Sequence, residues 1–195
     1  DPDSPGRYDF SRRHIVESVE GSLRRLHTDR LDLLLLHRPD PLMEPAEVAA
    51  AFDVLQSAGK ARHFGVSNHT AAQISLLRKS VRQPLVANQV ELSLLHHPLI
   101  DEGIVFNQHG TAYTASAGTL DYCRQHGILL QAWSPLAPGR LAGSADAIEP
   151  SLRPVAEAAG KLAQQHGCSI EAILVAWLLR HPAGIQPIVG MTNPQ

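Results

Sequence analysis

The chain has 195 residues, of which 44% are hydrophobic and 18% are charged, and this composition is typical of a globular domain. Its formal net charge is −2, so no chain-wide positive field attracts nucleic acid or an anionic membrane surface. No apolar run approaches the roughly 18 residues of a membrane span. We therefore expect neither nucleic acid nor a membrane as a partner.

The two cysteines indicate a cellular location, and the chain ends indicate whether the sequence is a whole protein. Cys123 and Cys168 lie far apart and in no redox or metal-ligand spacing, which favours a reducing, cytoplasmic location. No signal peptide is recognised. The chain starts on a polar segment without Met and stops at Thr192-Asn193-Pro194-Gln195, a typical helix start. We therefore expect a piece of a longer protein.

The first half alternates helical patterns with short apolar runs. Apolar Ile15, Val19 and Leu23 at steps of four predict a helix over about residues 11–27. The run Leu31–Leu36, interrupted only by Asp32, is typical of a strand covered on both faces. Further strands are expected over 61–66 and 85–92, and further helices over 45–58, ended by Gly59, and over 70–79, capped by Thr70.

The second half begins with a break in this pattern. Periodicity fails from about 96 to 116, a length far above a common connection, which predicts a long loop of the functional or mobile kind. A helix over 119–126, a strand over 128–133, a Gly/Ala-rich loop over 138–150, helices over 152–166 and 169–181, and a strand over 187–189 follow.

Strands that alternate with helices, without hairpin signals, predict parallel strands joined by helical crossovers. The fold class is therefore α/β. A doubly wound sheet and a (β/α)8 barrel both satisfy this pattern, but no GxGxxG follows any strand. The barrel is the favoured reading.

In such barrels the chemistry lies at the carboxyl ends of the strands, so polar residues there are the candidates. They are His37, Arg38 and Asp40; Ser67 and Asn68; Asn88, Gln89 and Glu91; Trp133 and Ser134; and Gly190. Amides and hydroxyls suit neutral hydrogen bonds to a carboxamide and a carbonyl. Only His37 and Glu91 are plausible metal ligands, so no metal site is expected.

Each candidate also has a purely structural reading. A histidine at a strand end is as often a hydrogen-bonding residue as a catalytic one. Ser67 and Asn68 are explained more simply as caps of the helix that begins near Thr70. Trp133 suits an ordinary core position. The His96-His97 pair lies in a loop without further spaced ligands, which favours packing over metal binding.

Four ordered motifs nevertheless resemble one family. The run Thr28–Asp40, with its Leu-rich strand and His37, resembles the signature of the aldo/keto reductases. Gly59–Asn68 resembles that family's next strand, Asn88–Glu91 the one after, and Trp133–Ala137 with Gly139 and Leu141 its cofactor loop. Arg38 after the histidine resembles the monomeric bacterial oxidoreductases. The resemblance implies a partial (β/α)8 TIM barrel, strands 4 to 8 with their helices, as a single incomplete domain over residues 1–195.

The resemblance also implies NAD(P)H-dependent reduction of aldehydes or ketones, in which the cofactor supplies the hydride. His37 matches the catalytic histidine that hydrogen-bonds the substrate carbonyl oxygen. Ser67, Asn68 and Gln89 match ligands of the nicotinamide carboxamide, Trp133 the stacking aromatic, Ser134, Leu136 and Gly139 the pyrophosphate loop, and Gly190 and Thr192 the start of the adenosine-phosphate site. The long loop over 96–116 would overhang the site.

The family's remaining catalytic residues have no match. Its Asp and Tyr belong to the first barrel units, and its Lys to the strand just before this chain begins. Tyr8, Tyr113 and Tyr122 do not sit in the tyrosine motif. NADPH is the implied cofactor, with NADH as the alternative, because the residues for the 2′-phosphate would follow Gln195.

Two alternative functions make different demands on these residues. A noncatalytic nucleotide-binding or regulatory module keeps the same pocket without turnover. An aldolase needs a Schiff-base lysine at a strand end, whereas Lys60, Lys79 and Lys161 fall on helix or loop positions. Five strands cannot close such a barrel, so we expect an exposed apolar strand edge. The carbonyl substrate and the oligomeric state stay open at this point.

Overall fold

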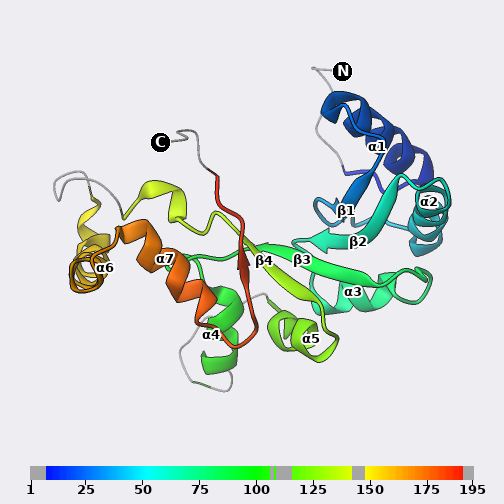
Figure 1. The fold of residues 1–195 in the computed structure, drawn as a ribbon. Helices are drawn as coiled ribbons and strands as arrows, with labels where there is room; N and C mark the ends of the chain where they lie inside the picture. Colours follow the sequence, from blue (N-terminus) through cyan, green and yellow to red (C-terminus); the bar gives the residue numbers. More distant parts are fainter. Residues whose placement is uncertain (1–7, 106–107, 109–115, 142–147, 191–195) are drawn as a thin grey trace. The chain divides into compact units, whose positions relative to one another are not determined.

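Five strands alternate with helices in the computed structural model, which describes residues 8–105, 108, 116–141 and 148–190 (Figure 1). The strands are parallel and follow one another through the sheet in chain order, β1-β2-β3-β4-β5. This arrangement confirms the α/β class and the parallel strands expected from the sequence. Within the described residues, no helix combines the length and the apolar character of a membrane span.

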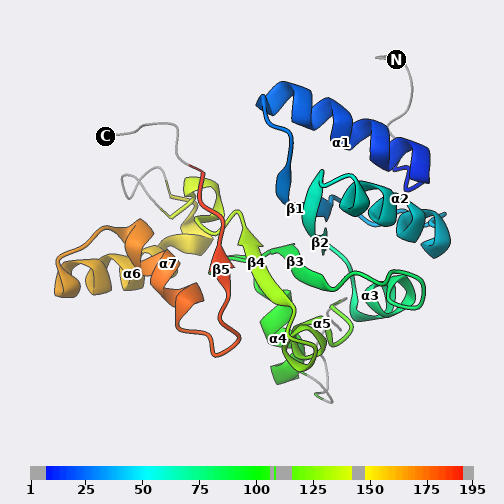
Figure 2. The same cartoon turned by 45° about the vertical axis from the view of Figure 1, so that its right-hand side comes forward.

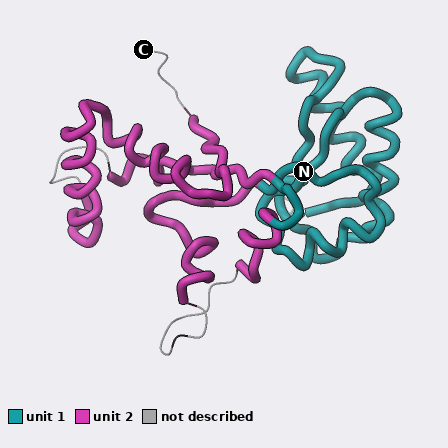
Figure 3. Tube along the Cα trace, turned by 60° about the horizontal axis from the view of Figure 1, so that its bottom comes forward, with its two compact units in different colours: residues 1–88, 125–128 teal, residues 89–124, 129–195 magenta. Residues whose placement is uncertain are grey.

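The chain divides into two compact units, which are drawn in different colours in Figure 3. Unit 1 comprises Asp1–Asn88 with Gln125–Ile128, and unit 2 comprises Gln89–Arg124 with Leu129–Gln195. The division falls inside a strand, between Asn88 and Gln89. The single incomplete domain over residues 1–195 stays a prediction.

Unit 1 follows the local signals of the sequence closely. Its elements are α1 (Arg12–Leu26), β1 (Leu31–Leu36), α2 (Pro45–Ser57), β2 (Ala61–Ser67), α3 (Ala71–Leu77) and the first residues of β3 (Leu85–Glu91). The side chain of Ser11 caps α1 by accepting the N–H of His14, and His27 ends the helix at a φ of 52°. Helices α1 and α2 lie side by side (Figure 2). These bounds agree with the predicted ones to within one to two residues.

The core of unit 1 depends on one aromatic pair and one glycine. The rings of Phe52 in α2 and Phe64 in β2 stack with centroids 4.2 Å apart, and both are fully buried. A Cβ on Gly65 would lie 2.6 Å from the carbonyl oxygen of Ala87 and 2.7 Å from a methyl carbon of Leu35. Only glycine allows β2 this close approach to its neighbours.

Strand β1 differs from its prediction. It pairs in parallel with β2, but Leu33, Leu34 and Leu35 are half-buried and not covered on both faces. The physical reason is its place at the end of the strand order, which leaves β2 as its neighbour within the described chain.

The later elements are α4 (Pro98–Val105), α5 (Thr119–Gln125), β4 (Leu129–Trp133), the 3-10 turns η1 (Ala137–Gly139) and η2 (Pro150–Leu152), α6 (Arg153–His166), α7 (Ile170–Leu179) and β5 (Gln186–Pro187). Strand β4 pairs in parallel with β5. A small core of Leu141, Ile148, Ala156 and Leu174 packs in unit 2.

Two predictions fail in this part of the chain. The expected loop over 96–116 contains helix α4, whose two turns bury only Leu99 and are too short to show a period in the sequence. The last strand is β5, Gln186–Pro187, one residue earlier and shorter than predicted. Ile188 still donates its N–H to Ala132, 2.8 Å away, but Val189 follows as exposed coil.

Candidate active and cofactor-binding site

The turn between β2 and α3 carries two of the predicted cofactor ligands. Thr70 is the N-cap of α3: its side chain accepts the N–H of Gln73, and the Gln73 side chain accepts the N–H of Thr70. This reciprocal capping box satisfies the start of the helix. The alternative that Ser67 and Asn68 cap α3 is therefore wrong, since both lie in the turn that precedes the cap.

Asn68 joins this turn to the end of β1. Its backbone has a φ of 59°, a left-handed conformation that asparagine tolerates better than most residues. Its Nδ2 donates to the carbonyl oxygen of His37 at 3.2 Å and to Oγ of Ser67 at 2.9 Å. The fold thus brings together three predicted site residues from two neighbouring strand ends, with the His37 side chain exposed.

Two buried residues lie beside this turn: Asn88, a strand-end candidate without a specific role in the sequence, and His69, which the sequence did not single out. The side chain of Asn88 accepts the N–H of His69 at 3.4 Å and donates to the His69 carbonyl at 2.9 Å. Nδ1 of His69 lies 2.8 Å from the carbonyl oxygen of Ser67. Burial lowers the pKa of His69, and the bond to Ser67 opposes this only in part. An amide within an apolar strand was the signal for Asn88.

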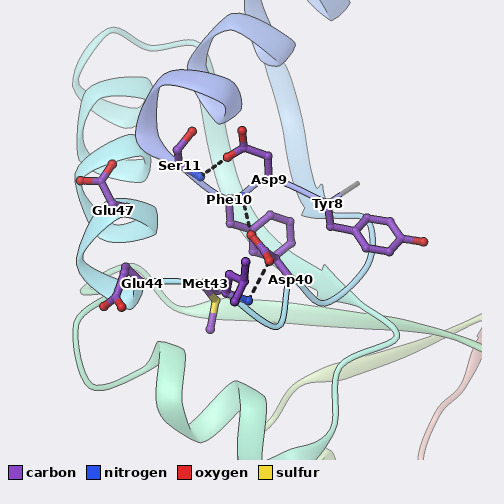
Figure 4. A pocket seen from close by; sticks show the side chains of 9 residues that line it. Tyr8, Asp9, Phe10, Ser11, Asp40, Met43, Glu44 and Glu47 are labelled. Atoms are coloured by element: carbon purple, nitrogen blue, oxygen red, sulfur yellow. Dashed lines mark hydrogen bonds between the residues drawn. The ribbon is translucent and has the colours of Figure 1, made fainter. Parts of the chain in front are cut away.

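The loop after His37 is fastened by Asp40. Its two carboxylate oxygens accept the N–H groups of Phe10 and Leu42, each at 2.9 Å (Figure 4). Asp40 therefore anchors the strand-end loop to the segment before α1, which gives it a structural role in holding His37.

A pocket of about 340 Å³ beside this loop is lined by acidic residues, among them Asp9, Asp40, Glu44 and Glu47 (Figure 4). Three of these carboxylates accept backbone N–H groups: Asp9 from Ser11, Asp40 as described, and Glu47 from Arg12. Within the described ranges, no group of three or more His, Cys, Asp or Glu side chains is arranged to hold a metal ion. Two of the pocket's carboxylates, Asp9 and Glu47, thus bind backbone N–H groups at the start of α1.

In unit 2 a row of glutamine amides crosses the sheet. Gln89 Nε2 donates to Gln131 Oε1 at 3.0 Å, and Gln131 Nε2 donates to Gln186 Oε1 at 2.8 Å. Gln131 is buried in β4. Gln131 was not among the sequence candidates, although a glutamine inside the apolar run Leu129–Trp133 is a usable signal. The row fixes the orientation of Gln89, a predicted carboxamide ligand.

Tight turns follow β4. The backbone carbonyl of Ser134 accepts the N–H of Ala137 at 3.0 Å, and the backbone carbonyl of Leu136 accepts the N–H of Gly139 at 3.1 Å. Ser134 and Ala137 have φ values of 53° and 50°, and Gly139 one of 74°. The left-handed region is sparsely populated for residues other than glycine, and residues held there, as Ser134 and Ala137 are, cluster at ligand-binding segments. Trp133 is half-buried, between a core and a surface position.

The other residues considered in the sequence lie as follows. Gly190 is exposed coil after β5, and Thr192 lies outside the described residues. His96 forms a backbone bridge with Ser93, and Nδ1 of His97 lies 2.8 Å from the Asp101 carboxylate. Lys60 follows α2 and pairs with Glu20, Lys79 follows α3, and Lys161 lies in α6. These lysines occupy the helix and loop positions predicted for them.

Comparison with known proteins agrees with the motifs. The pattern of the aldo/keto reductase family matches residues 1–195. The chain is 44% identical over 185 residues to oxidoreductase YdhF of Escherichia coli (strain K12), which covers 95% of this chain and 56% of the relative. It is 38% identical over 187 residues to a 6-dehydroglucose reductase of Agrobacterium fabrum (strain C58 / ATCC 33970), with 95% and 56% covered.

A solved structure gives the same answer for the fold. The crystal structure of the thermostable aldo-keto reductase Tm1743 with the inhibitor epalrestat aligns with a TM-score of 0.71 at 27% identity. The alignment covers 94% of this chain and 58% of that chain. The chain thus spans about half the length of the curated relatives it matches, which agrees with a partial barrel. On the match over its whole length and on its four ordered motifs, the chain belongs to the aldo/keto reductase family.

Proposed function

We propose that this chain supplies the histidine and the nicotinamide-binding side of an aldo/keto reductase that reduces aldehydes or ketones with NADPH. The observation that carries the proposal is the hydrogen bond from Asn68 to the His37 carbonyl. It places a candidate cofactor ligand against the segment that presents the candidate catalytic histidine. The alternative is a noncatalytic nucleotide-binding module with the same residues.

The donor set suits the cofactor. Ser67 and Asn68 in unit 1, and Gln89 in unit 2, offer neutral hydroxyl and amide groups of the kind that pair with a carboxamide. Trp133 would stack on the nicotinamide ring, and the turns after β4, with Ser134, Leu136 and Gly139, would receive the pyrophosphate. Gly190 and Thr192 would begin the adenosine-phosphate site. NADH remains the alternative cofactor.

The protein's own part in the reaction is orientation and charge stabilisation. When bound, the nicotinamide supplies the hydride. His37 donates a hydrogen bond to the carbonyl oxygen of the substrate and stabilises the negative charge that develops there. Ser67, Asn68 and Gln89 fix which face of the nicotinamide ring is presented. The proton-donating tyrosine of the family is assigned to no residue of this chain.

The substrates for the assay follow from one relative. It is named a 6-dehydroglucose reductase, so an oxidised sugar belongs in the substrate panel beside a generic aldehyde.

We also propose a reducing, cytoplasmic location. Cys123 and Cys168 are both free thiols, which supports this location.

Cofactor binding is tested through tryptophan fluorescence, because the chain has only Trp133 and Trp177. In a Trp177→Phe variant, NADPH should quench the emission of Trp133 with a saturable dependence on concentration. The matched Trp133→Phe variant should lose the signal. Absence of saturable binding to the unmodified chain by calorimetry would overturn the proposal.

Catalysis is tested by NADPH consumption with the substrate panel, for this chain and for any longer product of the same reading frame. His37→Ala should lower the rate about 100- to 1000-fold, as expected for a lost donor to a developing oxyanion. Binding without turnover in every form would favour the noncatalytic module.

A further inference from the structure

We infer that Asn88 and His69 are positioning residues that hold the Ser67–Asn68 turn in the conformation that binds the nicotinamide carboxamide. The inference rests on the proposed function for the identity of the ligand. The holding of the turn rests on the contacts of unit 1 alone.

Asn88 fixes the backbone of residue 69. Its side chain is 0% exposed, and it contacts both polar groups of one residue, the N–H and the carbonyl of His69. Because Oδ1 can only accept and Nδ2 can only donate, these two partners allow a single orientation of the amide. Rotation of the backbone at residue 69 would break two buried hydrogen bonds, which is costly away from water.

His69 fixes the backbone two residues earlier. Its side chain is buried, with the residue 2% exposed, and its ring stacks on Phe10 with centroids 6.1 Å apart and an angle of 5° between the planes. Nδ1 donates to the carbonyl of Ser67, while Nε2 has no hydrogen-bond partner among the described residues. A neutral ring with its proton on Nδ1 makes the bond to Ser67 and avoids a buried charge, in agreement with a pKa lowered by burial.

Asn68 is therefore bracketed by two fixed neighbours. The ring of His69 holds the carbonyl of Ser67, and Asn88 holds residue 69 on the other side. Between them, Asn68 keeps its left-handed φ of 59° and the direction of its amide toward the His37 carbonyl. Strained conformations of this kind persist only where the surroundings determine them.

Loss of Asn88 or His69 should weaken only the part of the cofactor site that binds the nicotinamide. Release of the turn would disturb the contacts of the carboxamide and leave the remainder of the dinucleotide site unchanged. The matched ligands are therefore NADPH and 2′-phospho-ADP-ribose, which lacks only the nicotinamide. General damage to the protein would weaken both ligands alike.

Calorimetric titration of the full chain with both ligands tests the cofactor role. Asn88→Ala and His69→Phe should each weaken NADPH about tenfold, the loss expected for a buried hydrogen-bond partner, and leave 2′-phospho-ADP-ribose within about twofold. Asn88→Asp keeps the acceptor for the His69 N–H and loses the donor, so its loss should be intermediate. If Asn88→Ala does not fold, Asn88→Asp and His69→Phe carry the test.

Gln83→Ala is the control, because Gln83 is also a buried amide of unit 1. Its Nε2 donates to Asp53 and Gln56, away from the turn. It should change neither affinity by more than about twofold, even where its loss of stability equals that of Asn88→Ala.

Hydrogen exchange of the free protein tests the holding of the turn without any ligand. The amides of Asn68 and His69 should exchange faster in Asn88→Ala and His69→Phe than in the unmodified chain or in Gln83→Ala. Unchanged exchange in both variants, equal losses for both ligands, or an unchanged NADPH affinity would overturn the inference. If the unmodified chain binds no NADPH, the proposed function fails, and with it the cofactor role of the pair, while exchange still decides whether the pair holds the turn.

Discussion

The two units hold their candidate site residues by different means. In unit 1, Asn68 bonds to the side chain of its neighbour Ser67, but the long-range bonds of Asn68 and Asn88 go to backbone groups 31 and 19 residues away in sequence. In unit 2, Gln89 and Gln131 bond to other side chains, 42 and 55 residues away. A backbone partner is present whatever residue occupies the position, whereas a side-chain partner depends on one residue type. The site in unit 1 should therefore tolerate changes in its neighbours better than the site in unit 2.

The largest expected effect on stability comes from a substitution that disturbs the backbone packing of unit 1. Gly65→Ala places a Cβ 2.6 Å from the Ala87 carbonyl oxygen, and strands cannot separate without loss of their hydrogen bonds. We expect the free energy of unfolding to fall by about 3 kcal/mol, measured by urea denaturation.

The control for this substitution is Gly160→Ala in α6 of unit 2. A Cβ there meets no atom within 4 Å, so it should stabilise the chain by about 0.5 kcal/mol through helix propensity. Equal effects at both glycines would show that the close approach at Gly65 has no energetic weight.

Acid should lower the stability of the chain through one histidine in each unit, His69, which is buried, and His181, which is half-buried. Burial lowers the pKa of His69 in unit 1, and burial with the nearby Arg124 lowers that of His181 in unit 2. Below the unfolded value of about 6.5, the unfolded chain binds protons that the folded chain does not. Stability is thus complete above about pH 6.5 and falls as the pH drops from there toward the lowered pKa of each folded histidine, more for buried His69 than for half-buried His181.

Variants assign this loss to the units. His69→Phe should remove more of the acid dependence than His181→Asn, because His69 is the more deeply buried ring. The measurement is urea denaturation between pH 7.5 and about 5. An acid dependence that survives both substitutions would show that other groups cause it.

The amide row of unit 2 is the next target. Gln131→Leu removes the bond that Gln131 accepts from Gln89 and the bond that it donates to Gln186, and both partners are at least partly exposed to solvent. We expect the free energy of unfolding to fall by about 1 kcal/mol, with a loss of NADPH affinity through Gln89. Full affinity in Gln131→Leu would show that Gln89 needs no such support.

Helix caps give the smallest contrast. Thr70 and Gln73 form two reciprocal bonds at the start of α3, whereas Ser169 accepts a single N–H at the start of α7. Thr70→Ala should lower the free energy of unfolding by about 1 kcal/mol and Ser169→Ala by about 0.5 kcal/mol, as measured by thermal denaturation. The reverse order would mean that the second bond of the box adds nothing.

Much of the fold follows from local patterns. Ser11 and Thr70 begin helices as their types predict, and the apolar run before His37 forms a strand with the predicted bounds. Helix α4 was missed because two turns with one buried residue, Leu99, leave no readable period. The partial burial of β1 was missed because it depends on what pairs beside the strand.

The sequence predicted the role of a site residue only where that residue matches the aldo/keto reductase family. His37, Ser67 and Asn68 belong to quoted motifs, and the fold places them together. Their roles toward the cofactor stay predictions. Asn88 and Gln131 were passed over as ligand supports, because a residue that acts through another needs the hydrogen bonds of the folded chain to be recognised.

The bond between Asp40 and Phe10 sets a limit on how far the chain can be trimmed. Tyr8 is 53% exposed, whereas Phe10 is buried and donates its N–H to Asp40. A protease that cleaves after aromatic residues should therefore cut after Tyr8 before it cuts after Phe10. Cleavage after Phe10 would separate the N-terminal segment from α1 and so weaken the support of the loop that presents His37.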